Sequence, residues 1–211
     1  MRKYEIPEKP FQYKILIDGR WQDSECGKTF DRESPGHGAV IGEYPLCTKL
    51  DTERAIKAAR KAFKNESWKM MPGSDRAKII NKVAALIREN ANELALIETL
   101  ESGKPISQAI DEMEWAAGIW DYAATLCRHQ YGDANNNLGK DMFAMMYREP
   151  IGVVAMITPW NFPLLIISQK LPFALAAGCT AVVKPSELTP GTTLKLGELL
   201  QQAGVPDGVV N

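Results

Sequence analysis

Short apolar runs alternate with amphipathic stretches in the last third of the chain. Two runs have the length and continuous apolar character of strands buried on both faces of a parallel sheet, residues 153–157 and 180–183. Each is followed by a stretch with helical periodicity, residues 164–177 and 192–203. The turn signal Asp207-Gly208 then leads toward a third strand. This order predicts a doubly wound parallel sheet with right-handed crossovers, which three strands do not complete.

The first two thirds of the chain predict a hairpin followed by helices. Asp18-Gly19 is a turn signal, and it predicts a hairpin near Trp21. Three helices are expected: from an N-cap at Asp51 to about residue 65, through apolar positions 79–97 to a stop at Gly103, and from Pro105 to about residue 129. A polar loop is predicted at residues 133–137 and an extended strand at residues 141–148.

These elements divide one α/β chain into three parts. Residues 1–137 supply the helical part with its hairpin. Residues 138–150 form a strand segment, and residues 151–211 begin a Rossmann-like sheet that is incomplete at its C-terminal end.

The composition argues against several classes of function. The 211 residues carry 25 basic and 26 acidic side chains, a net charge of −1, with no basic face for nucleic acid. Four widely spaced cysteines and two histidines give no pattern for a disulfide framework or a metal site. Residues 151–169 are uncharged, but Pro159 and Pro163 would leave backbone polar groups unpaired in lipid. Because the charged N-terminus also lacks the apolar core of a secretory signal, we expect a cytoplasmic protein without membrane or nucleic-acid partners.

Asn161 follows the first buried strand in a turn stiffened by Pro159 and Pro163. An amide at this place can donate a hydrogen bond into the crevice where such sheets bind ligands. The alternative is an asparagine that caps the next helix.

Lys184 and Glu187 follow the second buried strand, three residues apart. An ammonium and a carboxylate can together bind a ribose diol, and a carboxylate repels a 2′-phosphate, which favours NAD over NADP. The alternative is a solvated ion pair in a loop.

The motifs around these residues resemble those of the NAD(P)-dependent aldehyde dehydrogenase superfamily. The likeness runs from IDGRW (17–21) through AIKAARKAF (55–63) and LESGKP (100–105). It is greatest in REPIGVVAMITPWNFPL (148–164), LAAGCTAVVKPSE (175–187) and AGVPDGVVN (203–211). The chain is similar to the N-terminal, cofactor-binding half of that family.

The resemblance implies oxidation of an aldehyde to an acid with NAD, or NADP, through a cysteine thiohemiacetal. It implies that Asn161 stabilises the oxyanion, and that Lys170 serves a proton relay used by some members, unless it is a helix-surface lysine. Phe162 falls where the family lines its substrate tunnel, or else belongs to the core. The implied cofactor contacts are Ile157, Thr158, Pro159, Trp160, Lys184, Ser186 and Glu187.

In the family, the nucleophilic cysteine and the general-base glutamate follow the segment that this chain matches. The resemblance therefore implies that both are missing here, and that the 211 residues are inactive alone. It also implies a homo-oligomer at full length, with residues 138–150 in the contact. The alternative is a non-catalytic truncated product that acts as a binding or assembly module.

Overall fold

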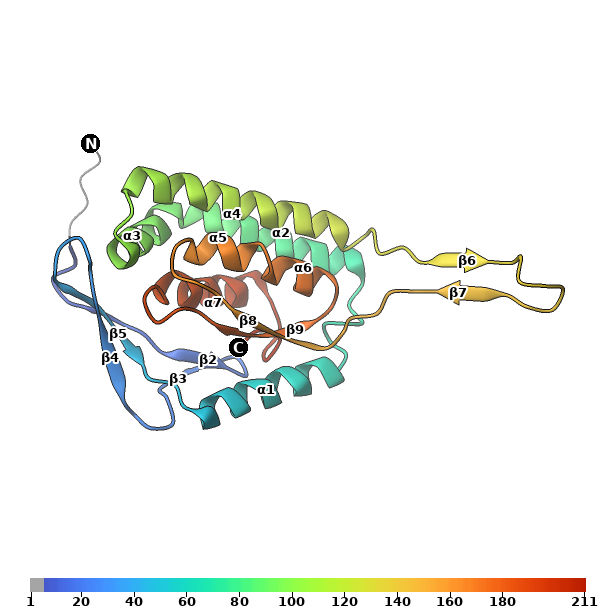
Figure 1. Ribbon diagram of the computed structural model, residues 1–211, viewed down its shortest axis with the longest axis horizontal. Helices are drawn as coiled ribbons and strands as arrows, with labels where there is room; N and C mark the ends of the chain where they lie inside the picture. The colour runs from blue at the N-terminus through green and yellow to red at the C-terminus, as the bar shows by residue number, and fades with distance from the viewer. Residues whose placement is uncertain (1–5) are drawn as a thin grey trace.

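The computed structural model describes residues 6–211, and two small sheets lie at one end of the molecule (Figure 1). A three-stranded sheet has the order β1 (Phe11–Gln12), β5 (Val40–Pro45), β4 (Thr29–Glu33). The predicted hairpin is confirmed as the antiparallel pair β2 (Ile15–Ile17) and β3 (Arg20–Gln22). Its turn places Asp18 at φ 50° and Gly19 at φ 76°, the two positive values that a type I′ hairpin turn requires.

Four helices follow: α1 (Lys49–Lys64), α2 (Gly73–Glu89), α3 (Ala91–Ser102) and α4 (Ile106–Leu126). The N-cap of α1 is Thr48, so the prediction of Asp51 as the cap is wrong. The Asp51 carboxylate accepts the Thr48 backbone N–H at 2.8 Å, and the Thr48 hydroxyl accepts the Asp51 N–H at 3.5 Å. This reciprocal capping box satisfies two backbone donors at the helix start.

The helix predicted through residues 79–97 is in fact two helices. Asn90 ends α2 and begins α3, and its side-chain amide donates to the Leu86 carbonyl at 2.8 Å. Such side-chain bonds to the backbone compete with helix continuation, whereas the apolar periodicity runs on across the break. The stop at Gly103 is confirmed by its left-handed conformation, φ 77°. The next helix, α4, ends at Leu126 rather than near residue 129.

Two strands, β6 (Asp133–Asn135) and β7 (Ala144–Met146), pair antiparallel and project from the body as an arm (Figure 1). The predicted loop at residues 133–137 is therefore wrong over its first three residues, while the strand predicted within 141–148 is confirmed in shorter form. Asparagine and aspartate have low strand propensity, but pairing with a partner strand overrides it.

The predicted parallel sheet is confirmed by β8 (Val153–Ile157) and β9 (Thr180–Lys184), which are parallel neighbours. Ala181 of β9 also forms a parallel bridge with Val210, the expected third strand. However, β8 is not buried on both faces, because Ala155 and Ile157 are exposed. These two side chains point to the same face, since successive side chains alternate along a strand. Nothing within residues 6–211 covers that face at the end of β8.

The crossover from β8 to β9 contains α5 (Pro163–Ser168) and α6 (Leu171–Ala176), and α7 (Gly191–Ala203) follows β9. The helix predicted over residues 164–177 is thus broken at Gln169–Lys170, just before Pro172. In a continuous helix, proline would lack a hydrogen bond and clash with the preceding turn. Gly178 (φ 91°) and Gly204 (φ 99°) end the crossover helices as predicted.

The elements are stacked in layers around this sheet (Figure 1). α1 packs on β8 and β9 from one side, α6 packs on β9, and α2 contacts α4, α6 and α7. The core between the layers includes two fully buried indoles, each with a hydrogen-bond acceptor. Trp68 donates to the Leu175 carbonyl at 3.2 Å, and Trp120 donates to the Ser168 hydroxyl at 3.0 Å. Within the described part of the chain, no helix is long and apolar enough to cross a bilayer.

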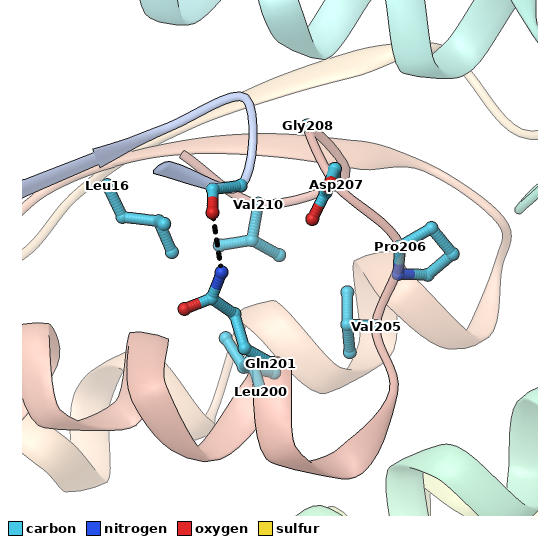
Figure 2. A pocket seen from close by; sticks show the side chains of 9 residues that line it. Leu16, Leu200, Gln201, Val205, Pro206, Asp207, Gly208 and Val210 are labelled. Carbon is cyan, nitrogen blue, oxygen red and sulfur yellow. Dashed lines mark hydrogen bonds between the residues drawn. The ribbon is translucent and has the colours of Figure 1, made fainter. Parts of the chain in front are cut away.

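A small hollow lies where the hairpin turn meets the end of α7 (Figure 2). The Gln201 side-chain amide donates to the Gly19 carbonyl there at 2.8 Å. The neighbouring residues 205–208 lead into the third strand, so this hollow lies at the amino-terminal edge of the sheet. Apart from Lys170, the predicted site residues lie at the opposite, carboxyl-terminal edge.

Candidate functional site

The carboxyl ends of β8 and β9 lie next to each other. Ile157, the last residue of β8, is in register with Lys184, the last residue of β9, and the Thr158 N–H donates to the Lys184 carbonyl at 3.2 Å. Beyond the strands, the Thr189 hydroxyl donates to the Trp160 carbonyl at 3.3 Å. The two loops that carry the predicted site residues are therefore in contact.

The turn after β8 leaves the side-chain amide of Asn161 without a hydrogen-bond partner among residues 6–211. Thr158 is buried, and its hydroxyl has no hydrogen-bond partner within residues 6–211. Pro159, Trp160 and Asn161 are exposed. Phe162, not Asn161, occupies the N-cap of α5, and no side chain caps that helix. The structure thus rules out the capping role for Asn161, and no residue of the described chain forms a hydrogen bond with its side chain.

The loop after β9 presents the predicted ion pair to solvent. Lys184 Nζ lies 3.6 Å from Glu187 Oε2, with 63% and 70% of the two side chains exposed. A backbone hydrogen bond and the Lys184 charge hold the pKa of Glu187 below its usual value. Ser186 is buried, and its hydroxyl accepts the Leu188 N–H at 3.2 Å. The Ser186 hydroxyl therefore shapes the loop, while Lys184 and Glu187 are the groups that face outward.

A buried carboxylate on α3 holds the end of this loop. Both oxygens of Glu101 accept the Gly191 N–H at 3.1 Å, and the Tyr44 hydroxyl donates to the same carboxylate. The Arg32 guanidinium donates to the Leu188 and Glu101 carbonyls, each at 2.6 Å. Burial raises the pKa of Glu101 to about 8. These contacts fix residues 188–191, immediately beyond the Lys184–Glu187 pair.

A second buried cluster lies under the turn that follows β8. Lys104 Nζ is 2.6 Å from Glu98 Oε1 and 2.5 Å from Glu112 Oε2. The same ammonium lies 4.6 Å from the centre of the Phe162 ring, and the Leu164 N–H donates to Glu98 at 3.5 Å. Burial raises the pKa of Glu98 above its usual value. Phe162 is thus part of a packed, charged support directly behind Asn161.

These supporting residues were missed by the sequence reasoning. Glu98 and Glu101 lie beside Ile97 and Leu100 on the buried side of α3, where charged side chains are not expected. Charged residues at apolar positions of a helix are the signal that could have identified them, because a buried charge needs a partner. Their partners lie far along the chain, so only the fold shows which loops they support.

Lys170 lies apart from the other candidates. It is exposed, and it occupies the break between α5 and α6. The six residues of α5 separate it from the Asn161 turn, which corresponds to about 9 Å of helix. The structure therefore brings Asn161, Lys184 and Glu187 to one edge of the sheet and leaves Lys170 at the far end of α5.

The group at the sheet edge fits part of a dinucleotide. Lys184 offers donors and Glu187 offers acceptors for a ribose diol, and Ile157 presents an apolar side chain that is 75% exposed beside them. The unpartnered Thr158 hydroxyl is a further polar group at this edge. Within residues 6–211, no three His, Cys, Asp or Glu side chains are placed to hold a metal ion.

Known proteins match nearly the whole chain. Residues 21–211 match the model of the aldehyde dehydrogenase family. Betaine aldehyde dehydrogenase 1 of Oryza sativa subsp. japonica is 42% identical over 203 residues, which are 93% of this chain and 40% of the rice protein. The structure of an NAD-dependent aldehyde dehydrogenase from Sinorhizobium meliloti is 48% identical with a TM-score of 0.94, over 96% of this chain and 41% of that one.

A third match carries a cofactor. Betaine aldehyde dehydrogenase from Staphylococcus aureus, solved in complex with NAD+, is 38% identical with a TM-score of 0.92, over 94% of this chain and 39% of that one. Since the matched share of these proteins is 39% to 41%, the chain spans about two fifths of the length of its relatives.

Proposed function

The chain belongs to the aldehyde dehydrogenase family, and from that premise we propose that it is the N-terminal, cofactor-binding part of an enzyme that oxidises an aldehyde to a carboxylic acid. The register of Ile157 with Lys184 carries the proposal, because it brings the Asn161 turn and the Lys184–Glu187 loop to one edge of the sheet. NAD, when bound, supplies the hydride acceptor. The proposal assigns neither the nucleophilic thiol nor the general base to these 211 residues.

Each residue at the sheet edge would contact a different part of the cofactor. The Lys184 ammonium donates to a ribose hydroxyl, and the Glu187 carboxylate accepts from both hydroxyls. Glu187 also repels a 2′-phosphate, which favours NAD, and NADP is the alternative cofactor. Ile157 offers an apolar contact, while the segment Thr158–Trp160 holds Asn161 in place beside the cofactor.

Asn161 would act on the substrate. Its side-chain amide donates to the negative charge that develops on the aldehyde oxygen, and the turn between Pro159 and Pro163 places this donor at the sheet edge. Support comes from its exposed position and from the absence of any hydrogen bond to its side chain within residues 6–211.

Titration of the protein that carries this chain with NAD, in wild-type and Lys184→Ala forms, tests the cofactor site. Lys78→Ala is the matched control, since Lys78 also forms an exposed ion pair three residues away, with Asp75 at 2.8 Å. We expect Lys184→Ala to raise the Kd for NAD and Lys78→Ala to leave it unchanged. Equal affinities in all three proteins would contradict the assignment.

Lys170 is proposed separately as a member of a proton relay, on the family resemblance. It would have to act from the far end of α5, at a distance from Asn161. A Lys170→Met variant whose pH profile of kcat matches that of the wild type would contradict the relay.

We also propose that residues 138–150, which contain the β7 strand of the arm, mediate assembly into a homo-oligomer. Their exposed apolar side chains support this, because contiguous apolar surface marks interaction sites. They are Met142 (63%), Phe143 (64%), Met145 (69%) and Met146 (64%). In a non-catalytic product, assembly through this arm would be the remaining function.

Sedimentation of a Met145→Lys variant tests the arm. Met70→Lys is the matched control, because Met70 is equally exposed at 69% but lies outside the arm. We expect only Met145→Lys to lower the mass of the assembly. A monomeric wild-type protein would contradict the proposal.

A cytoplasmic location is proposed as well, and the four free cysteines fit it. A fluorescent fusion of the protein that concentrates in an organelle would contradict it.

A further inference from the structure

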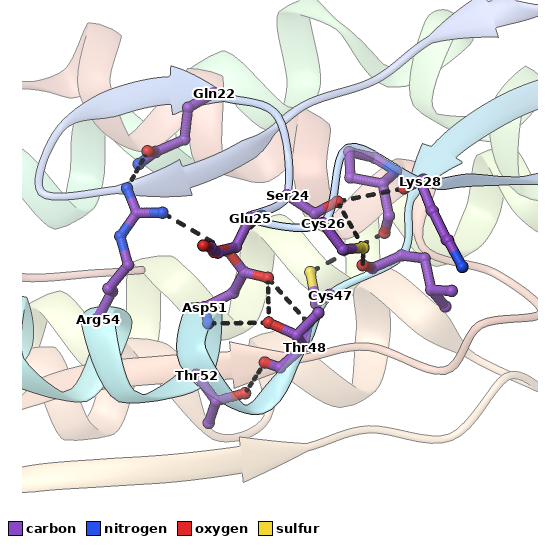
Figure 3. A network of polar contacts seen from close by, with 12 residues as sticks. Gln22, Ser24, Glu25, Cys26, Lys28, Cys47, Thr48, Asp51, Thr52 and Arg54 are labelled. Carbon is purple, nitrogen blue, oxygen red and sulfur yellow. Dashed lines mark hydrogen bonds and ion pairs between the residues drawn. The ribbon is translucent and has the colours of Figure 1, made fainter.

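Two of the four cysteines are exposed and occur in loops that touch each other. Cys26 lies between β3 and β4, and Cys47 lies between β5 and α1. Figure 3 shows both in one polar network at the start of α1. The other two cysteines, Cys127 and Cys179, are buried.

The two loops are joined by hydrogen bonds. The Leu46 N–H donates to the Lys28 carbonyl at 2.8 Å, which extends the β4–β5 pairing by one step. A turn closed by the Gly27 N–H on the Ser24 carbonyl, at 3.0 Å, folds Cys26 back toward this pair. The Cys26 thiol then reaches the Leu46 carbonyl at 3.3 Å. Leu46 is bonded to Cys47, so the Cys26 sulfur lies against the backbone of the residue next to Cys47.

The surroundings of the two sulfur atoms differ. Hydrogen bonds from the Lys28 backbone and the Ser24 side chain lower the pKa of Cys26, which favours its thiolate. Partial burial and the charges of Asp51 and Cys26 raise the pKa of Cys47, and the Lys184 ammonium opposes that shift. One thiol is therefore suited to react first with a dissolved oxidant, and the other is suited to attack afterwards.

From this geometry we propose that Cys26 and Cys47 form a redox-active pair that hydrogen peroxide converts into a disulfide. The Cys26 thiolate attacks one peroxide oxygen, the O–O bond breaks, and the departing hydroxide takes a proton to become water. This leaves a sulfenic acid on Cys26. The Cys47 thiol then loses its proton, its sulfur attacks the Cys26 sulfur, and the S–O bond breaks to release a second water. Two thiols and one peroxide thus give one disulfide and two waters.

The disulfide would join the β3–β4 loop to the segment that ends in Thr48, the N-cap of α1. A thiol reductant would reverse it by exchange. The pair lies within this chain and takes no part in the proposed dehydrogenase chemistry, so it is testable without activity.

Peptide mapping after oxidation tests the pair. The protein that carries this chain is treated with hydrogen peroxide, its remaining thiols are alkylated, and it is digested with trypsin without reductant. We expect the peptide of residues 21–28 to be linked to that of residues 33–49, with the loss of two hydrogen atoms in mass. The link should disappear after dithiothreitol.

Variants and isotope labelling decide between outcomes. Cys127→Ser should keep the link, whereas Cys26→Ser and Cys47→Ser should each abolish it. Oxidation of an equal mixture of unlabelled and 15N-labelled protein should give links only between peptides of the same label. Links of mixed label, or oxidation of Cys26 to sulfinic acid without any link, would overturn the proposal.

Discussion

The carboxylate of Glu101, on α3, accepts the backbone N–H of Gly191, the first residue of α7. The contact is so close that a side chain on residue 191 has no room. A Cβ there would lie 2.8 Å from a Glu101 oxygen and 2.6 Å from Ile97 Cγ2. Because α7 follows the Lys184–Glu187 loop, the helical part of the chain holds one end of the candidate ribose site.

Gly191→Ala should therefore destabilise the fold. The new methyl group forces buried atoms apart, an overpacking that typically costs about 1–3 kcal/mol. Urea denaturation measures the change. Gly118→Ala is the matched control, since a Cβ at residue 118 in α4 meets no atom within 4 Å. That substitution should stabilise the protein by roughly 0.5–1 kcal/mol, because alanine favours helix. If both substitutions changed the free energy of unfolding in the same direction, the close contact at Gly191 would be contradicted.

Glu101 should make stability depend on pH. Burial raises its pKa to about 8, above the value of about 4.3 in an unfolded chain. Between these values the folded protein binds more protons than the unfolded one, so stability falls as pH rises. The contribution of Glu101 to the free energy of unfolding is fully present below its pKa in the unfolded chain. It is lost as pH rises through its pKa in the folded protein.

Urea midpoints of wild-type and Glu101→Gln protein between about pH 5 and 8.5 measure this effect. The wild type should lose up to about 1.4 kcal/mol more per pH unit than the variant. Glu98 also has a raised pKa, but it is present in both proteins. Glu53→Gln, an exposed control on α1, should keep the wild-type slope. Parallel curves for wild type and Glu101→Gln would contradict the raised pKa.

Lys104 should be among the most sensitive charged residues of the chain. Lys104→Met leaves Glu98 and Glu112 buried without their cation, and breaking such a pair typically costs about 3–5 kcal/mol. Chemical denaturation measures the loss. Lys78→Met, in an exposed pair, should change stability by less than about 0.5 kcal/mol. Similar small effects at both positions would show that the cluster is hydrated.

Several elements of the fold were predicted because their signals are local. The apolar runs of β8 and β9 and the turn at Asp18-Gly19 are complete within a few residues. The break at Asn90 escaped prediction because a side-chain bond to the backbone leaves the apolar period intact. The pairing of Asp133–Asn135 escaped because a partner strand supplies it.

The candidate site also has a part that the sequence predicts and a part that it does not. Lys184 and Glu187 are adjacent to a predicted strand end, so their position at the sheet edge follows from topology. Glu98 and Glu101 support loops that are far away in the sequence. Glu98 accepts from Leu164, 66 residues later, and Glu101 accepts from Gly191, 90 residues later. No period or spacing within α3 contains that information, because the contacts exist only in the folded chain.

Glu187 should govern the choice between NAD and NADP. Glu187→Gln removes the negative charge that would face a 2′-phosphate, so the preference for NAD should fall by about tenfold in the ratio of the two Kd values. Calorimetric titration with each cofactor measures the ratio. Asp75→Asn, which removes the carboxylate of a similar exposed pair, is the control. An unchanged ratio in Glu187→Gln would assign cofactor choice to other residues.

Asn161→Ala separates catalysis from folding most sharply. Since the Asn161 side chain is exposed and forms no hydrogen bond within residues 6–211, its loss should change stability by less than about 0.5 kcal/mol. In the active protein that carries this chain, kcat for aldehyde oxidation should fall by about 10²–10³-fold, with a smaller change in KM, because the donor acts on charge that develops in the transition state. Asn81→Ala, at an exposed position on α2, should leave kcat unchanged. An unchanged kcat would remove Asn161 from the catalytic site, and a fall in kcat that tracks a loss of stability would show a structural role instead.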